Sequence, residues 1–314
     1  MAKKQKVCYS KENTPVEGFA GLQPVTVAQA RSPSGKWEQG GKTMRIVDIH
    51  THIYPDQVAQ KAIAALTKGP LRPLTGCTAA EAQQAAEASG VIYSVCLPVA
   101  TRAKQVEHIN RFSAETNSRY SKLICFAGIF PGAADMEAQI DLAAQLKLPG
   151  IKIHPQFQGV FLDDPAMVRL VCLADAYHMP VIFHGGLDIA KPYPLYSSPW
   201  RAAHLLQMAA KQGVSKPRLI FAHMGGYALW GEVEKELVGK DVYFDTSFLA
   251  GRIPKDVIKR IILNHGAERI LFGTDFPWQG VEENRDFLLS LGLSQQQNQA
   301  IFYDNAAALL HLDE

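Results

Sequence analysis

Short runs of β-branched and other apolar residues alternate, from residue 45 onward, with longer segments in which apolar side chains recur at helical spacing. Eight of these runs predict β-strands: 45–49, 91–97, 124–129, 150–154, 181–184, 219–223, 242–245 and 270–274. Strands that alternate with helices are joined by crossovers, so the predicted strands are parallel. Eight such units in about 230 residues match the size of a closed (β/α)8 TIM barrel, an α/β fold. A doubly wound open sheet is the competing fold, but no glycine-rich dinucleotide-binding turn follows the first run.

Helix boundaries between the strands carry capping signals. Thr78, with Glu81 three residues later, forms a capping box, and Gly90 marks the end of that helix. The tail over 276–314 predicts at least two helices, one of them over 294–310, packed on the outside of the barrel. Proline stands at three more helix starts, where the first helical turn tolerates it: Asp164-Pro165, Ser198-Pro199 and Ile253-Pro254.

The beginning of the chain differs from the rest in pattern and charge. Residues 1–43 are polar and show neither strand nor helix periodicity, which predicts an N-terminal extension ahead of one domain over 44–314. Residues 1–45 carry eight Lys or Arg and three Glu, so they hold +5 of the net charge of +2 and the rest of the chain holds −3. A nucleic-acid partner would need a basic stripe on the folded domain, and none is visible there, so we expect no such partner.

Composition sets the class of protein. The chain has 314 residues, of which 47% are hydrophobic and 20% charged, as in an ordinary soluble globular protein. No run approaches the roughly 18 apolar residues of a membrane span, and no apolar signal core follows the basic start. We therefore expect a cytoplasmic protein without a membrane partner. The five cysteines are scattered without a CxxC pair, which predicts reduced packing residues.

Histidines and one aspartate stand at the C-terminal ends of five predicted strands: His50 and His52 in the first, His154 in the fourth, His184 in the fifth, His223 in the sixth and Asp275 in the eighth. In a (β/α)8 barrel these strand ends surround one central pocket, where catalytic residues lie. Any one of these histidines could be an ordinary hydrogen-bonded residue at a strand end. Chance would have to place all six groups at the same end of five strands, so the set predicts one shared site.

Several imidazoles with one carboxylate and no thiolate suit Zn²⁺, with Mn²⁺, Fe²⁺ or Co²⁺ as alternatives. His50 and His52 are two residues apart, so on a strand both imidazoles project to the same side. We predict one divalent ion held by His50, His52, His184 and Asp275, with positions open for water and substrate. Water on such an ion has a pKa near 7. His223 lies outside this set and is the predicted general acid/base, a role that Asp275 could share.

The strand-end motifs, taken in chain order, resemble those of the amidohydrolase superfamily. They are HTH at 50–52, GIKIHP at 150–155, the histidine at 184, HMGG at 223–226, YFDTS at 243–247 and FGTDFPW at 272–278. The most similar branch contains uncharacterised hydrolases and metal-dependent decarboxylases similar to aminocarboxymuconate-semialdehyde decarboxylase. The resemblance covers about residues 45–310. It implies the same four metal ligands and a catalytic role for His223, and it is compatible with a homodimer.

Binuclear members of that superfamily use a carboxylated lysine on the fourth strand to bridge two metal ions. Here Lys152 and His154 share a strand face, but His154 ends the strand and Lys152 lies deeper. We therefore expect one metal ion, with Lys152 and His154 among the groups around the substrate.

Loop residues after the strands are further candidates for substrate binding. Gln156 and Phe157 follow the fourth strand, Arg201 follows the fifth and Trp278 follows the eighth. Aromatic side chains here could line an apolar cavity or simply pack the loops onto the barrel. Arg201 could hold a substrate carboxylate through its planar guanidinium. Asp245 could orient a catalytic or metal-binding histidine through a hydrogen bond.

The leading functional hypothesis is a metal-dependent hydrolase that attacks an amide, lactone or ester carbonyl of a small molecule. The alternative is non-oxidative decarboxylation of an aromatic or unsaturated carboxylic acid. That reaction needs a cation for the carboxylate, for which Arg201, Lys191 and Arg252 are candidates. A non-catalytic metal- or ligand-binding barrel is disfavoured, because the predicted ligands and the base are all present.

A chain that starts at Met44 is expected to be as soluble and active as the full chain, because residues 1–43 offer no periodic apolar face to the core. Thermal unfolding and activity of the two lengths would check this. A shortened chain that fails to fold would contradict it.

Overall fold

The computed structural model describes residues 38–39, 42–67, 71–214, 216 and 218–312. Most of the predicted extension over 1–43 lies outside this range, as does the predicted packing role of Cys8. Within it, β1 (Glu38–Gln39) and β2 (Lys42–Thr43) pair antiparallel, a ladder too short to leave a periodic pattern in the sequence. Among the described residues, no helix combines the length and apolarity needed to cross a membrane.

All eight predicted strands are present, and all run parallel. They are β3 (Val47–Thr51), β4 (Tyr93–Cys96), β5 (Leu123–Cys125) with β6 (Ala127–Gly128), β7 (Ile151–Ile153), β8 (Val181–Phe183), β9 (Leu219–Phe221), β10 (Tyr243–Asp245) and β11 (Ile270–Leu271). β5 and β6 form one strand interrupted at Phe126, whose backbone N–H donates to the Cys96 carbonyl. Sequential neighbours pair throughout, as right-handed βαβ units require.

The ring of strands closes between β3 and the residues after β11. The Ile49 N–H donates to the Phe272 carbonyl at 2.9 Å, and the Asp275 N–H donates to the His50 carbonyl at 2.8 Å. Thr51 and Phe276 form a parallel bridge at the same seam. The fold is therefore the predicted (β/α)8 barrel.

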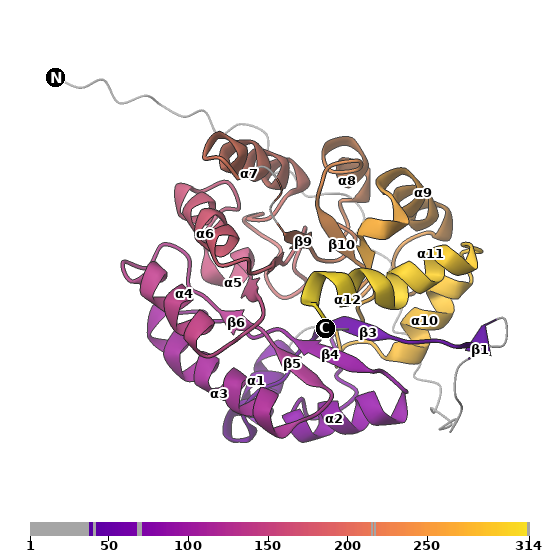
Figure 1. Ribbon diagram of the computed structural model, residues 1–314, viewed down its shortest axis with the longest axis horizontal. Coiled ribbons are helices and arrows are strands. Elements are labelled where there is room, and N and C mark those ends of the chain that lie inside the picture. Colours follow the sequence, from indigo (N-terminus) through magenta and orange to yellow (C-terminus); the bar gives the residue numbers. More distant parts are fainter. Residues whose placement is uncertain (1–37, 40–41, 68–70, 215, 217, 313–314) are drawn as a thin grey trace. The chain divides into compact units, whose positions relative to one another are not determined.

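Helices surround the strands (Figure 1). They are α1 (Asp56–Leu66), α2 (Ala79–Ala88), α3 (Val106–Arg119), α4 (Met136–Gln145), α5 (Pro155–Gln158), α6 (Pro165–Ala176), α7 (Pro199–Lys211), α8 (Trp230–Glu236), α9 (Lys255–His265), α10 (Val281–Leu289), α11 (Gln295–Gln299) and α12 (Asn305–Leu310). The capping box of Thr78 and Glu81 forms as predicted, and Asp164 caps α6 through the Ala166 N–H. Pro254 lies at the N-cap of α9 rather than inside its first turn.

Two hydrophobic layers hold the barrel together. The outer layer packs alternate strand residues, such as Ile151, Phe183 and Phe221, against the helices. The inner layer fills the barrel with residues such as Ile182 and Ile220. This alternation follows from the two-residue period of a strand that is buried on both faces.

The C-terminal tail differs from the prediction in two ways. The expected helix over 294–310 is interrupted by a π-helical segment, Ala300–Asp304, which buries Ile301, Phe302 and Tyr303 in succession. The tail was also expected to pack outside the barrel, but Tyr303 and α12 join the inner hydrophobic layer. In Figure 1 α12 crosses the centre of the ring. The apolar interior of the barrel needs a cover at the N-terminal ends of its strands, where Asn305 donates to the Ile270 carbonyl.

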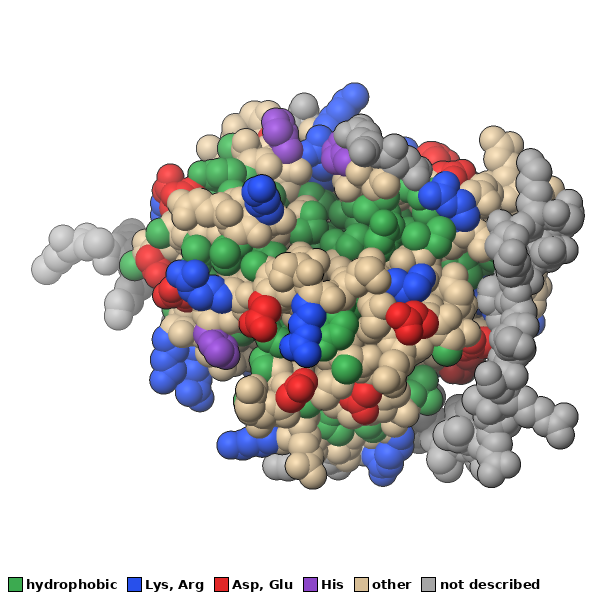
Figure 2. All heavy atoms as spheres, turned by 60° about the horizontal axis from the view of Figure 1, so that its bottom comes forward, with side chains coloured by type: hydrophobic (Ala, Val, Ile, Leu, Met, Phe, Trp, Pro, Cys, Tyr) green, Lys and Arg blue, Asp and Glu red, His purple; other side chains and the backbone are tan. Residues whose placement is uncertain are grey.

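One face of the molecule shows hydrophobic side chains gathered among charged ones (Figure 2). Acidic and basic side chains are interspersed around them on this face. That mixture resembles an ordinary protein surface.

Gly186 in the loop after β8 has a φ of 80°, and a Cβ there would lie 2.3 Å from the Tyr227 backbone nitrogen. Gly213 has a similar φ of 92°, but no atom of the described residues beyond its chain neighbours lies within 4 Å of its Cβ position. Gly213→Ala should lower the free energy of unfolding by about 1–2 kcal/mol through backbone strain alone. Gly186→Ala should cost at least about 1 kcal/mol more, because a clash is added. Urea unfolding measures both, and equal losses would show that the loop relaxes freely.

Candidate metal centre

The six predicted polar groups meet in one cavity of about 460 Å³ at the C-terminal ends of the strands. His50 and His52 come from β3 and the residue after it, His154 and His184 follow β7 and β8, and His223 and Asp275 lie in the turns after β9 and β11. His223 and Asp275 have left-handed φ values of 59° and 67°. Such backbone strain in non-glycine residues is common at functional sites.

When its ring is neutral, the hydrogen bond of His52 to a carbonyl leaves its Nε2 atom without a proton. Its Nδ1 atom lies 3.0 Å from the Leu97 carbonyl oxygen and must donate to it. The bare Nε2 then faces Asp275 Oδ1 at 3.0 Å. Two lone pairs at this distance repel each other unless a cation lies between them. Atoms bound to one tetrahedral zinc ion lie about 3.3–3.6 Å apart, close to this separation.

His50 presents a bare nitrogen to the same carboxylate. Its Nδ1 atom donates to Asp245 Oδ2 at 2.8 Å, and its Nε2 atom lies 3.4 Å from Asp275 Oδ1. Burial, together with the nearby charge of Lys152, lowers the pKa of His50 to about 3, so the ring is neutral. His50, His52 and Asp275 therefore offer three ligand atoms that converge.

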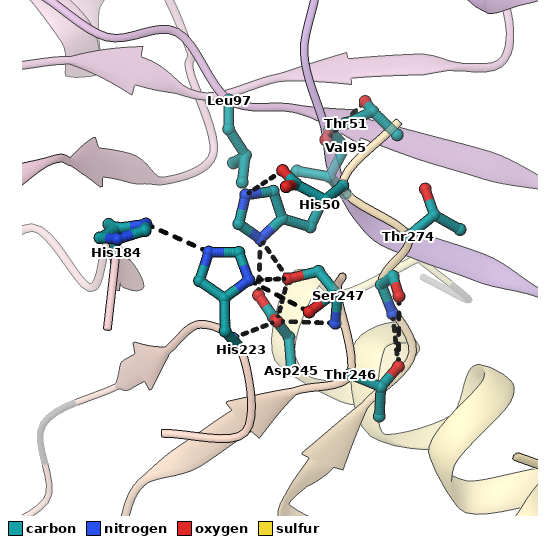
Figure 3. A network of polar contacts seen from close by, with 12 residues as sticks. His50, Thr51, Val95, Leu97, His184, His223, Asp245, Thr246, Ser247 and Thr274 are labelled. Carbon is teal, nitrogen blue, oxygen red and sulfur yellow. Dashed lines mark hydrogen bonds and ion pairs between the residues drawn. The ribbon is translucent and has the colours of Figure 1, made fainter. Parts of the chain in front are cut away.

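His184 and His223 form a second convergent pair (Figure 3). The Nε2 atom of His184 lies 3.3 Å from the Leu187 carbonyl, and Nδ1 of His223 lies 3.1 Å from the Ser247 carbonyl. The two remaining nitrogens, His184 Nδ1 and His223 Nε2, face each other at 3.1 Å. Both lack a proton when the rings are neutral, so this pair also requires a proton or a metal ion between its members.

Asp245 contacts both groups, through His50 in the first and His223 in the second. Its Oδ2 atom accepts the hydrogen bond from His50, and its Oδ1 atom accepts the backbone N–H groups of His223 and Ser247 at 2.9 and 3.0 Å. Burial alone would raise the pKa of Asp245, but the hydrogen bonds donated by the side chains of His50 and Ser247 help to bring it below its usual value. The buried carboxylate is thus ionised. It orients the ring of His50 and holds the backbone of His223, as expected of a group behind a metal ligand.

Lys152 stands beside the ligand atoms. Its Nζ atom lies 3.3 Å from His50 Nε2, and the residue is 1% exposed. Burial lowers its pKa to about 8. Among the described residues that line the cavity, Lys152 is the one Lys or Arg.

The predicted substrate contacts divide into two groups. Lys152, His154, Phe157 and Trp278 line the cavity. Gln156 does not: its amide donates to the Lys191 and Pro194 carbonyls and accepts from the Tyr196 N–H, so it holds the loops together.

Arg201 is also not among the described residues that line the cavity. Its Nη1 atom donates to Asp163 at 2.6 Å, and the guanidinium lies over the rings of Phe161 and Trp200. The prediction that Arg201 meets the substrate is not supported by this placement, because the charge is already paired.

Some residues of the cavity were not predicted. Asp188, Tyr227 and Phe248 line it. The sequence offered a signal for Asp188, because it follows His184 by four residues in the same loop. Tyr227 and Phe248 follow β9 and β10 and carry no chemical signature that separates them from core aromatics.

A search of family models matches residues 47–312 with the family described as Amidohydrolase. This confirms the resemblance found in the strand-end motifs. A search of curated proteins finds no match.

Solved structures share the fold at low sequence identity. 2,6-Dihydroxybenzoate decarboxylase from Rhizobium aligns with a TM-score of 0.64 and 15% identity over 86% of this chain and 100% of its own. The apo form of IDCase from Metarhizium anisopliae gives 0.65 and 20% over 86% and 98%. An Acinetobacter baumannii protein described as a probable 2-pyrone-4,6-dicarboxylic acid hydrolase gives 0.60 and 13% over 85% and 100%.

Asp245→Asn is expected to lower the affinity for a divalent metal ion about 10–100-fold, because an amide cannot accept hydrogen bonds through both of its atoms. Competition with a chelator measures the affinity. Asp163→Asn is the matched control, since it removes a carboxylate paired with Arg201 and should leave metal binding unchanged. Equal affinity of wild type and Asp245→Asn would contradict the proposed role of Asp245.

Proposed function

The chain belongs to the amidohydrolase family, and on that premise we propose that it is a metal-dependent decarboxylase of small aromatic or unsaturated carboxylic acids. The observation that carries this proposal is the position of Lys152, a buried cation beside the ligand atoms in a largely apolar cavity. A carboxylate bound there would meet a positive charge, and the rest of the molecule would contact apolar walls.

The proposed metal ligands are His50, His52, His184 and Asp275, for one divalent ion. Neutral imidazoles with a carboxylate suit Zn²⁺, and Mn²⁺, Fe²⁺ or Co²⁺ fit the same atoms. A divalent ion in this position supplies a Lewis acid that polarises a substrate oxygen. The bare nitrogens deduced from the hydrogen bonds support this proposal, most directly for His50 and His52, whose ligand atoms lie within 4.8 Å of each other and of Asp275.

Separate side chains are proposed to bind the carboxylate and to deliver the proton. Lys152 binds and orients the carboxylate that leaves as CO₂. When the bond between the carboxyl carbon and the substrate breaks, its electron pair stays on the substrate carbon and takes up a proton. His223 is proposed to take a proton from water at Nε2 and to deliver it to that carbon, with Asp275 as the second candidate. The Ser247 carbonyl, which accepts from Nδ1, holds the ring in place.

The other cations considered from the sequence do not suit the carboxylate. The Lys191 Nζ donates to the Gln156 carbonyl at 2.7 Å, and the Arg252 guanidinium lies over the Phe248 ring at 3.9 Å. Neither residue lines the cavity, nor does Arg201. Lys152 therefore replaces all three in the proposal.

Hydrolysis of an amide, lactone or ester is the second candidate. It was the leading hypothesis from the sequence, and the bare Nε2 of His223 would also suit removal of a proton from water. Solved structures of similar fold include both activities, and decarboxylases are prominent among them. A cytoplasmic location and a homodimer remain predictions.

The two reactions differ in their products. Metal-loaded protein should release CO₂ from an aromatic or unsaturated acid, whereas a hydrolase would release an acid from esters or lactones. Lys152→Met should lower kcat/KM for the acid at least about tenfold, because the cation for the carboxylate is lost. His223→Asn should lower kcat about 10²–10⁴-fold.

Lys61→Met, on the exposed side of α1, is the control and should keep full activity. Release of CO₂ that survives both chelation and His223→Asn would contradict the mechanism. Hydrolysis without any release of CO₂ would establish the second candidate in its place.

A further inference from the structure

A second polar group lies in the cavity beside the metal centre. It consists of His154, after β7, and Asp188, in the loop after β8. Their side chains are 8% and 13% exposed, and His154 Nε2 lies 3.5 Å from Asp188 Oδ2. Neither residue has a part in the proton transfer or metal binding described above.

His154, His184 and Asp188 place ligand-type atoms within 4.8 Å of one another, which raises the question of a second metal ion. The rings of His154 and His184 stack with centroids 4.2 Å apart and only 9° between their planes. Nitrogen lone pairs lie in the ring plane, so those of two parallel stacked rings do not converge on one ion. The Nδ1 atom of His184 already faces His223. The geometry therefore disfavours a second metal ion.

The hydrogen-bonding capacity of the pair is incompletely used. Asp188 Oδ1 accepts the backbone N–H groups of Ala190 and Lys191, both at 2.8 Å, so the carboxylate is held firmly. Within the described part of the chain, its Oδ2 atom has only the 3.5 Å contact with His154, which is longer than an ordinary hydrogen bond. The Nδ1 atom of His154 is buried and has no hydrogen-bond partner among the residues that the structure describes. Buried polar atoms without partners are unfavourable, and a bound ligand can satisfy them.

We propose that His154 and Asp188 recognise a hydrogen-bond donor, a hydroxyl or amino group, on the same substrate molecule that meets the metal centre. The substrate class is thus a hydroxy- or amino-substituted carboxylic acid, and this part of the inference rests on the proposed function. Asp188 Oδ2 accepts from the substituent. His154 supplies one further acceptor or donor, according to its tautomer.

The dimensions of the cavity agree with a small ring that spans both polar groups. A single imidazole, that of His184, separates His154 from His223. The ring of Phe157 packs against His154 with centroids 4.3 Å apart, and Leu187 and Trp278 add apolar surface. One substituted ring can therefore contact these walls while its two polar groups reach the two centres.

The negative charge of Asp188 makes the site formed by His154 and Asp188 selective between substrates. The carboxylate of Asp188 repels a second carboxylate on the substrate, so a dicarboxylic acid should bind worse than its hydroxy or amino counterpart. Burial raises the pKa of Asp188, and the backbone N–H groups of Lys191 and Ala190 oppose that rise by stabilising the charged form.

Calorimetric binding to metal-loaded protein tests the proposal without any turnover. The ligands are benzoate, the hydroxy- and aminobenzoates, and benzenedicarboxylates, each measured on wild type, Asp188→Ala and His154→Phe. The hydroxy or amino group should improve the affinity of wild type about tenfold in at least one ring position. Both variants should lose that gain while they bind benzoate as wild type does. His154→Phe keeps the ring stack with His184, and Asp256→Asn, on the surface of α9, is the matched control.

Methyl esters of the same compounds separate this inference from the proposed reaction. A hydroxyl gain that appears with the esters but not with the acids, and that Asp188→Ala abolishes, would support the donor site and overturn the decarboxylase proposal. No gain from any hydroxyl or amino group, a gain that survives both variants, or tighter binding of the dicarboxylates would overturn the role of His154 and Asp188.

Discussion

The proposed metal centre depends on hydrogen bonds made by the nitrogen of each histidine that faces away from it. The carbonyl oxygens of Leu97, Leu187 and Ser247 and the carboxylate of Asp245 accept these bonds. Each acceptor fixes one tautomer, and the other nitrogen is left bare and aimed inward. Because carbonyl acceptors belong to the barrel and its loops, the arrangement of lone pairs is a consequence of the fold. A cation is then needed to bring these lone pairs together at 3.0–3.4 Å.

The sequence allowed prediction of the groups whose position follows from the strand period and from the common C-terminal end of the strands. His50, His52, His184, His223 and Asp275 could be placed in this way, because parallel strands in a closed ring leave one mouth for all of them. The location of the tail could not be predicted. The apolar pattern of α12 reports that a face is buried, but not whether that face meets the outer helices or the barrel interior.

The contacts of the loop side chains could not be predicted from the sequence either. Gln156 follows a strand end as closely as the residues that line the cavity do, and Arg201 lies in the first turn of α7, the helix after β8. Arg201 pairs with Asp163, and Gln156 hydrogen-bonds to the backbone of Lys191 and Tyr196. These partners are distant in the chain, so no local sequence pattern indicates that the two side chains are already engaged. Spacing predicts which edge of the barrel a residue occupies, whereas pairing decides whether its charge or amide remains available to a ligand.

The metal centre and the pair of His154 and Asp188 also differ in which of their polar atoms already have partners. Around the proposed metal centre, each outward nitrogen has a partner, and the inward atoms meet in two neighbouring sets, one of His50, His52 and Asp275 and one of His184 and His223. At His154 and Asp188 the unsatisfied atoms are two, on facing side chains, and the neighbouring stack prevents them from sharing an ion with His184. At the metal centre, lone pairs that point toward one another can be satisfied by a metal ion. At the second site, the free oxygen of Asp188 beside the neutral ring of His154 can be satisfied by a hydrogen-bond donor. The apolar wall between them makes it favourable for one small molecule to supply both.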